Sequence, residues 1–244
     1  MQKILGQMRK AITDYQMINE GDRIAVGVSG GKDSVALLWG LILLRRFIGI
    51  NFSIVAITLD IRVEKKAGDF SAIKKICEEN SVEFVLKETD LWEIIFDVRK
   101  EKNPCSLCAR MRRGLLHDTA KEYSCNKIAL GHHRDDAVET FFMNLFNEGR
   151  IGCFSPVSYL SRKDLYMIRP LIFTEEKDII RAIEKENLPI VKSRCPADGN
   201  TNRETTKNFV AERVSENPYF KDNIIGAMIR GNISGWGNNN EENN

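Results

Sequence analysis

The sequence of 244 residues predicts an α/β protein with a doubly wound, mostly parallel sheet and a helical C-terminal extension. Three observations predict this fold class. Short apolar runs typical of buried strands alternate with segments that carry apolar residues at helical spacing. A glycine-rich turn joins the first of these strands directly to an apolar helix. Beyond residue 149 the alternation gives way to segments that are mainly helical.

The first 130 residues account for four of the strands. Residues 1–19 have apolar side chains at helical spacing, and Gly21-Asp22 ends that helix. Apolar runs predict strands at residues 23–28, 52–59, 82–86 and 127–130. Helices are expected at 35–44, 72–79, 91–98 and 106–123. The last of these follows Asn103-Pro104, which is typical of a helix start.

The rest of the chain adds one strand and three helices. A helix over residues 135–147 precedes a strand at 165–168, which Arg169-Pro170 ends. Thr174 is a candidate N-cap for a helix to about residue 187, with Glu175 and Glu176 in its first turn. Residues 203–216 predict the final amphipathic helix. The expected parts are an N-terminal helix (1–20), a main domain (21–190), a C-terminal segment (191–230) and a disordered Gly- and Asn-rich tail (231–244).

The composition is ordinary for a globular protein, with 43% hydrophobic and 29% charged residues and a net charge of +2. No apolar run reaches the ~18–20 residues of a membrane span, and the N-terminus lacks the apolar core of a signal peptide. We therefore expect a cytoplasmic, reduced protein without a membrane partner. Its six cysteines are then free thiols, metal ligands or catalytic groups rather than disulfides.

Local charge is more informative than net charge. Residues 99–113 hold six Lys or Arg side chains against one Glu. Lys192, Arg194 and Arg203 lie around Cys195 in the sequence. A phosphate-rich partner can dock on such basic segments. A solvated basic face is the alternative interpretation.

The glycine-rich turn Ser29–Ser34 reads Ser-Gly-Gly-Lys-Asp-Ser. Between a strand and a helix, it exposes backbone N–H groups at the positive end of the helix dipole, which suits an anion. The glycines allow a phosphate to approach closely, and the lysine and serines add donors. A Walker A loop is excluded because Asp33 follows Lys32, and a dinucleotide fingerprint because Ser29 occupies its second glycine position. A turn without a ligand is the alternative.

Three cysteines are candidates for metal or sulfur chemistry. Cys105 and Cys108 form a Cys-x-x-Cys pair at a helix start, where they share a face and the helix end favours the thiolate. Alone, the pair fits half a zinc site, a redox pair or chance. Cys195 lies in a loop beside a proline and basic residues, where a core cysteine is not expected. Three thiolates suit a 4Fe-4S cluster with one open iron, or a sulfur relay. Arg112 shares the helix face of Cys108.

A second polar loop, residues 131–136, follows the fourth predicted strand and reads Gly-His-His-Arg-Asp-Asp. The carboxyl ends of strands line the ligand crevice of a doubly wound sheet, so this loop is expected to face Ser29–Ser34. Its adjacent carboxylates suggest Mg²⁺ binding or general-base chemistry. Helix capping by Asp135 is the alternative. We expect one carboxylate to cap the helix or hold the metal, and the other, Asp136, to act chemically.

Together these motifs resemble the tRNA 2-thiocytidine synthetase family, a group of cluster-containing tRNA thiolases among the PP-loop ATP pyrophosphatases. The resemblance covers about residues 1–217 and rests on Ser29–Ser34, residues 104–114 and 131–140, Ile-Arg-Pro-Leu at 168–171, and Cys195. It implies an adenine nucleotide alpha hydrolase-like fold. It also implies an ATP-dependent tRNA sulfurtransferase that adenylates the C2 oxygen of a pyrimidine, a cytidine in the anticodon loop. Pyrophosphate leaves first, and sulfur then displaces AMP.

The resemblance further implies ligands and residue roles. ATP, Mg²⁺ and a 4Fe-4S cluster are the expected cofactors. The expected partners are tRNA, a sulfur donor (a cysteine desulfurase persulfide or free sulfide) and a second copy in a homodimer, since residues 35–44 are apolar enough for a core or an interface. Cysteines 105, 108 and 195 match the cluster ligands, and the matching catalytic residues are Asp136, Arg112 and Lys32. The nucleotide-binding residues are Ser29, Gly30, Gly31, Lys32, Asp33, Ser34, Thr58, Gly131, His132 and Asp135.

Two other functions compete with this interpretation. A PP-loop ligase such as a tRNA lysidine synthetase would attack the adenylate with an amine, and it would have no use for three converging cysteines. A nucleotide- or RNA-binding module would use its Cys-x-x-Cys pair to hold a structural zinc. The metal content of the purified protein separates the cluster enzyme from both.

Overall fold

The structure is a computed structural model that describes residues 1–98, 104–192, 195 and 202–237. Within these residues, one six-stranded sheet has the order β3-β2-β1-β4-β6-β5. All neighbouring strands are parallel except β5 and β6, which are antiparallel. This confirms the doubly wound, mostly parallel sheet. The strands are β1 (Asp22–Gly27), β2 (Phe52–Asp60), β3 (Glu83–Glu88), β4 (Lys127–Ala129), β5 (Val157–Leu160) and β6 (Leu165–Ile168).

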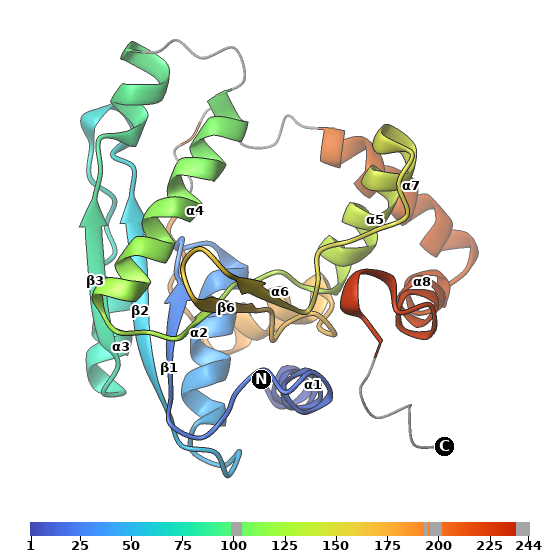
Figure 1. Ribbon diagram of the computed structural model, residues 1–244, viewed down its shortest axis with the longest axis horizontal. Helices are drawn as coiled ribbons and strands as arrows, with labels where there is room; N and C mark the ends of the chain where they lie inside the picture. The colour runs from blue at the N-terminus through green and yellow to red at the C-terminus, as the bar shows by residue number, and fades with distance from the viewer. Residues whose placement is uncertain (99–103, 193–194, 196–201, 238–244) are drawn as a thin grey trace.

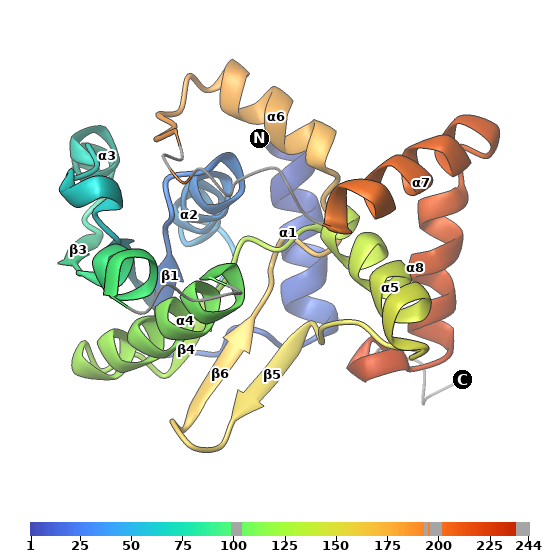
Figure 2. The same ribbon diagram turned by 90° about the horizontal axis from the view of Figure 1, so that it is seen from above.

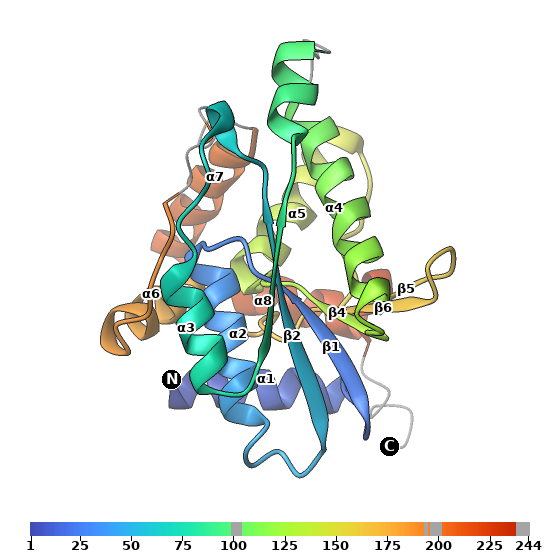
Figure 3. The same cartoon turned by 90° about the vertical axis from the view of Figure 1, so that its left-hand side faces the viewer.

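Helices cover both faces of this sheet. Figure 3 shows α2 and α3 on one side of the strands and α4 on the other. A second group, α5, α7 and α8, packs together beside the sheet (Figures 1 and 2). The helices are α1 (Gln2–Asp14), α2 (Lys32–Leu44), α3 (Ser71–Glu79), α4 (Pro104–Glu122), α5 (Arg134–Glu148), α6 (Glu176–Lys185), α7 (Asn202–Glu216) and α8 (Phe220–Arg230). Three short helical segments complete the described structure. They are the 3-10 helices η1 (Val63–Lys65) and η3 (Ile233–Gly235) and the π-helix η2 (Glu93–Val98).

The two faces of the sheet bury alternate residues of each strand, as the strand period of two requires. On β1, Ile24 and Val26 pack into the larger core with α1 and α2. Ala25, between them, packs into the smaller core with Leu116 and Ala120 of α4. Both faces of β1 are therefore buried, each beneath a different set of helices.

Helix α2 is a core helix. Val35, Leu37, Leu38 and Leu41 are all 3% exposed or less. The apolar run 35–44 is thus covered within a single copy of the chain, which settles the choice between core and interface in favour of core. No helix of the described residues is long and apolar enough to cross a membrane.

Several element boundaries differ from the predictions. The N-cap of α5 is His133 rather than Asp135. The N-cap of α6 is Glu175 rather than Thr174, which is fully buried one residue earlier. Strand β5 was not expected. It is a four-residue edge strand whose pairing depends on β6. The helix over 203–216 is not the last, because α8 follows it.

The C-terminal segment is ordered further than predicted. Trp236 is completely buried, and its indole N–H donates to the Phe154 carbonyl oxygen at 2.8 Å. Its own carbonyl accepts a hydrogen bond from the Tyr15 hydroxyl at 2.8 Å. Burial of this large side chain outweighs the disorder that glycine and asparagine favour. The expectation of disorder from residue 231 is therefore wrong for 231–237, and residues 238–244 lie outside the described residues.

Candidate active site

The glycine-rich loop connects the end of β1 to the start of α2, as predicted. Gly30 has φ +88°, a conformation that suits glycine, and its carbonyl accepts the Val191 N–H at 3.0 Å. A Cβ at Gly30 would lie 2.7 Å from the Val191 Cβ. The segment after α6 therefore packs against the glycine-rich loop. This contact leaves room only for glycine at position 30.

The loop serines hold the turn in shape. The Ser34 hydroxyl donates to the Gly31 carbonyl at 2.8 Å and lies 3.2 Å from the Ser29 hydroxyl. Gly31 is the N-cap of α2 and has no side chain with which to cap the helix. The first N–H groups of α2 therefore remain available to an anion.

Lys32 lies between two carboxylates. Its Nζ is 3.0 Å from Asp33 Oδ2 and 3.0 Å from Glu176 Oε1. Burial alone would lower the pKa of Lys32, but the two carboxylates outweigh burial and raise it. The loop lysine is thus charged and already surrounded by anionic groups from α2 and α6.

The polar loop 131–136 packs directly against the glycine-rich loop. A Cβ at Gly131 would lie 3.0 Å from the Asp33 carbonyl carbon and oxygen and 3.1 Å from the Ser34 nitrogen. The His133 Nε2 is 3.6 Å from Asp33 Oδ1. The predicted meeting of the two loops at the carboxyl ends of the strands is confirmed.

The paired carboxylates have different surroundings. Asp135 is buried, and its oxygens accept hydrogen bonds from the Lys221 ammonium and from the Glu176 N–H. Burial would raise the pKa of Asp135, but these hydrogen bonds lower it. Asp135 therefore joins α5, α6 and α8, and both its oxygens are occupied. Its predicted role in nucleotide binding stays a prediction.

Asp136 belongs to the capping box of α5 and to a charged pair. Its Oδ2 accepts the His133 N–H at 2.9 Å, and its own N–H donates to His133 Nδ1 at 3.3 Å. Its Oδ1 is 2.6 Å from Arg203 Nη2, while Arg203 Nε donates to Glu139 at 2.8 Å. Burial would lower the pKa of Arg203, but Asp136 and Glu139 raise it. In this state Asp136 is held by Arg203.

His132 lines the same loop on its apolar side. Its ring lies 5.0 Å from the ring of Phe154, and Nδ1 has no hydrogen-bond partner among the described residues. Burial, with nearby Arg169 and Arg203, lowers its pKa to about 3, so the imidazole is neutral. Arg169 is itself buried and stacks on Phe154 at 5.1 Å. This wall of the site is positively charged without an acidic partner for Arg169 among the described residues.

Thr58 and Asp33 occupy contrasting positions. Thr58 is fully buried and donates its hydroxyl to the Val28 carbonyl at 2.9 Å, so it links β2 to the residue that precedes the glycine-rich loop.

Asp33 accepts a hydrogen bond from Lys32 with one carboxylate oxygen, while its buried Oδ1 has no hydrogen-bond partner in the described part of the chain. An unpartnered carboxylate oxygen beside a phosphate-binding loop fits a Mg²⁺ ligand.

Cys105, Cys108 and Cys195 are the three predicted cluster ligands. Cys105 is exposed at the start of α4, and Cys108 and Cys195 are half-buried. Burial raises the pKa of Cys108, Arg112 lowers it, and the neighbouring Cys195 and Cys105 raise it further. Cys108 is therefore within electrostatic reach of Arg112, Cys195 and Cys105. The role of the three cysteines as cluster ligands stays a prediction.

The donor set fits a cluster in kind, because thiolates are the usual ligands of iron–sulfur clusters. Across residues 1–98, 104–192, 195 and 202–237, no three His, Cys, Asp or Glu side chains are already placed around one metal position. The other cysteines are poor ligands, because burial raises the pKa of Cys77 to about 12, of Cys125 to about 11 and of Cys153 to about 12.

Sequence reasoning missed three charged residues of the site. Glu176 was assigned only to a helix first turn, but it contacts Lys32. Lys207 contacts Glu176 from α7, and Arg203, noted only as a basic neighbour of Cys195, contacts Asp136. The available signal was the spacing of Arg203 and Lys207, four residues apart on one helix face. Arg194 lies outside the described residues.

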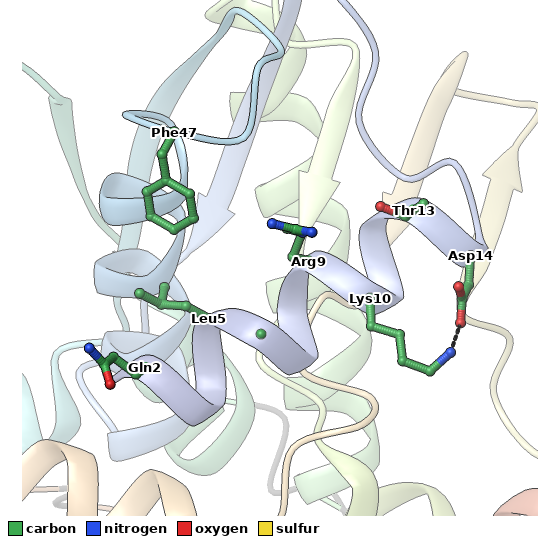
Figure 4. A pocket seen from close by; sticks show the side chains of 8 residues that line it. Gln2, Leu5, Arg9, Lys10, Thr13, Asp14 and Phe47 are labelled. Atoms are coloured by element: carbon green, nitrogen blue, oxygen red, sulfur yellow. Dashed lines mark hydrogen bonds and ion pairs between the residues drawn. The ribbon is translucent and has the colours of Figure 1, made fainter.

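A separate pocket of ≈ 490 Å³ lies on the outer side of α1 (Figure 4). Its floor is the exposed face of that helix, and Phe47 forms one wall. It contains none of the predicted site residues, so we assign the chemistry to the two loops that meet at Gly131. The lining residues are Gln2, Leu5, Gly6, Arg9, Lys10, Thr13, Asp14 and Phe47.

Comparison with known proteins agrees with this geometry. The family model described as a PP-loop domain matches residues 2–216. A tRNA-cytidine(32) 2-sulfurtransferase from Acinetobacter baumannii (strain ACICU) is 38% identical over 231 residues, covering 93% of this chain and 76% of the relative. A protein of the same name from Geotalea daltonii is 37% identical over 229 residues, covering 93% and 90%.

A solved structure agrees as well. The U34-tRNA thiolase NcsA from Methanococcus maripaludis, with its 4Fe-4S cluster, superposes with a TM-score of 0.74 and 25% identity. The match covers 93% of this chain and 76% of that chain. The sheet, the loop pair and the similarity along nearly the whole chain lead to one conclusion: the chain belongs to the PP-loop family, in the group of the tRNA-cytidine 2-sulfurtransferases.

Proposed function

We propose that this protein is an ATP-dependent tRNA sulfurtransferase that replaces the C2 oxygen of a cytidine in the anticodon loop with sulfur. The observation that supports the proposal is the close packing of Gly131 on Asp33 and Ser34, by which the glycine-rich loop and loop 131–136 contact each other. The relatives named tRNA-cytidine(32) 2-sulfurtransferase support tRNA as the substrate and cytidine 32 as the target.

The glycine-rich loop would bind the triphosphate of ATP. The first N–H groups of α2 and the Lys32 ammonium would stabilise charge on the departing pyrophosphate. The unpartnered Asp33 Oδ1 would hold Mg²⁺. Adenylation of the C2 oxygen turns a poor leaving group into AMP, which is a good one.

Asp136 would act on the nucleoside once the ion pair between Asp136 and Arg203 is broken. Its carboxylate lies at the start of α5, next to the loop that would hold the phosphates. With Arg203 engaged by a bound phosphate instead, Asp136 becomes available as a base near the reacting carbon. Neutral His132 and the ring of Phe154 would line this region, next to the buried Arg169.

Cys105, Cys108 and Cys195 would hold a 4Fe-4S cluster, with Arg112 beside them. Such a cluster, when bound by three thiolates, supplies an open iron that can carry a sulfur atom. The exposed Cys105 leaves this side of the site open to a sulfur donor, a desulfurase persulfide or free sulfide. The basic side chains of α4 would contact tRNA phosphates. We place the enzyme in the cytoplasm and retain a homodimer as part of the proposal.

Nucleoside analysis of tRNA tests the proposed function. Deletion of the gene should remove 2-thiocytidine, and the wild-type chain should restore it, because no other activity supplies that sulfur in the proposal. Lys32→Ala and Cys108→Ala variants should not restore it. An unchanged set of thiolated nucleosides in the deletion strain would contradict tRNA thiolation.

Metal analysis tests the cluster separately. Protein purified without oxygen should be brown and hold about four irons per chain, the content of one such cluster. A Cys195→Ala variant should lose most of this iron, because one of three ligands is gone. A colourless preparation with one zinc per chain would instead favour the structural-zinc alternative.

A further inference from the structure

One carboxylate, that of Glu176, bridges the lysine of the glycine-rich loop and a lysine of α7. Its Oε1 is 3.0 Å from Lys32 Nζ, and its Oε2 is 3.0 Å from Lys207 Nζ. The side chain is 22% exposed, so the bridge is open to solvent on one side only. The backbone of Glu176 is also anchored, because its N–H donates to the buried Asp135 carboxylate at 2.8 Å.

Lys207 reaches Glu176 from α7. Arg203 and Lys207 are four residues apart, so they share the face of α7 that meets α5 and α6. Figure 2 shows the starts of α6 and α7 facing each other beside α5. The charges that face Lys207 from these elements are Glu176, Glu139 and Lys32, and the hydrogen bond to Glu176 raises the pKa of Lys207.

The position of the Glu176 carboxylate is one that a phosphate group would suit. Lys32 belongs to the loop whose N–H groups are free to bind an anion, and a carboxylate already contacts that lysine at hydrogen-bond distance. A phosphate has more anionic oxygens than a carboxylate and can contact both ammonium groups at once. Two lysines that share one carboxylate are therefore spaced to share one phosphate.

We propose that Lys207 is a second phosphate-binding lysine of the nucleotide site, and that Glu176 occupies the phosphate position between Lys207 and Lys32 until nucleotide displaces it. This inference deepens the proposed function, on which it rests, by assigning α7 to the site of the departing pyrophosphate. It makes Glu176 a competitor of the phosphate rather than a ligand of its metal.

Calorimetric titration with inorganic pyrophosphate, and then ATP, tests the assignment without Mg²⁺ and with it. Glu176→Gln should bind both probes more tightly, about three- to tenfold, because a partly exposed carboxylate no longer has to be displaced from the two lysines. Lys207→Met should bind them about tenfold more weakly, and Lys207→Arg should recover most of the affinity.

Matched controls lie one residue away. Glu175 bridges Lys177 at 2.7 Å and Arg134 at 3.7 Å, outside the contacts of the glycine-rich loop. Glu175→Gln and Lys177→Met should therefore bind both probes as the wild type does. They carry the same changes of charge as the test variants. Any change in their probe affinity therefore measures the effect of net charge alone.

The outcomes separate this inference from the proposed function. Weaker probe binding by Glu176→Gln, in either condition, would overturn the competitor role and make Glu176 a ligand of the metal or nucleotide. Equal behaviour of Lys207→Met and Lys177→Met would overturn the role of Lys207 while wild-type binding leaves the proposed function standing. A wild-type chain that binds neither probe would overturn both.

Discussion

At the scale of single residues, Gly131 is the contact point between the two active-site loops. A Gly131→Ala change places a methyl group about 3 Å from backbone atoms of Asp33 and Ser34, which cannot rotate away. We expect the free energy of unfolding to fall by about 1–3 kcal/mol, the range for overpacking. ATP affinity should fall as well, because the glycine-rich loop must move. Chemical denaturation and nucleotide titration measure the two effects.

Gly114 provides the control for that substitution. It lies inside α4, and a Cβ added there meets no heavy atom within 4 Å. Gly114→Ala should stabilise the protein by about 0.5–1 kcal/mol, because alanine loses less entropy than glycine in a helix. Equal effects of the two changes would show that the contact at Gly131 is not tight.

His132 should make stability depend on pH. Its pKa is about 3 in the folded chain and ordinarily 6.5, so only the unfolded chain takes up a proton as the pH falls between these values. The free energy of unfolding should therefore drop below pH 6.5, by up to about 1.4 kcal/mol per pH unit from this group. Denaturation of the wild type and a His132→Asn variant between pH 7 and 5 should show a smaller slope for the variant. Parallel curves would contradict the burial of a neutral imidazole.

At the scale of elements, a buried ion pair joins the starts of β1 and β4. Lys127 Nζ lies 2.7 Å from Asp22 Oδ2, and both side chains are 6% exposed or less. Lys127→Met leaves the Asp22 charge buried without its partner, so the free energy of unfolding should fall by about 3–5 kcal/mol. ATP binding to the variant that remains folded should be unchanged, because the pair lies at the opposite ends of the strands from the loops.

A double change tests the cause. Asp22→Asn combined with Lys127→Met removes both charges, and it should recover a large part of the lost stability. A double variant as unstable as Lys127→Met alone would assign the loss to packing of the lysine stem. Denaturant titration of the four proteins in the cycle gives the answer.

Elements with their own apolar pattern were predictable from the sequence, and elements that depend on partners were not. The apolar run after the glycine-rich loop determines α2 by itself, because nearly every side chain is buried. Strand β5 buries little and exists through its pairing with β6, while α8 fully buries only Ile225 and Met228. The cap of α5 was misassigned because a histidine ring, rather than the following carboxylate, accepts the N–H of Asp136.

At the scale of the whole molecule, the site combines the first turns of four helices that are far apart in the sequence. Lys32, Asp136, Glu176 and Arg203 come from α2, α5, α6 and α7 in turn. The two loops could be predicted because strand ends converge in a doubly wound sheet. The lysine bridge of Glu176 could not, because no local pattern relates residues 32, 176 and 207.

Removal of the C-terminal turn should destabilise the entire fold. A chain that ends after Arg230 loses Trp236, whose indole is fully buried and bonded to Phe154. We expect a loss of about 3–5 kcal/mol in the free energy of unfolding, the range for removing a buried tryptophan. A chain that ends after Gly237 should match the full chain in thermal unfolding. If both truncations unfold alike, the turn contributes nothing to stability.

The bond between Trp236 and Phe154 also sets an order of events during translation. The two residues are 82 positions apart, and a ribosome adds roughly 5–20 residues per second. The Phe154 carbonyl is therefore made roughly 4–16 s before Trp236, the residue that donates a hydrogen bond to it. A growing chain can form its sheet and glycine-rich loop in that interval, but this hydrogen bond can form only after Trp236 has been made.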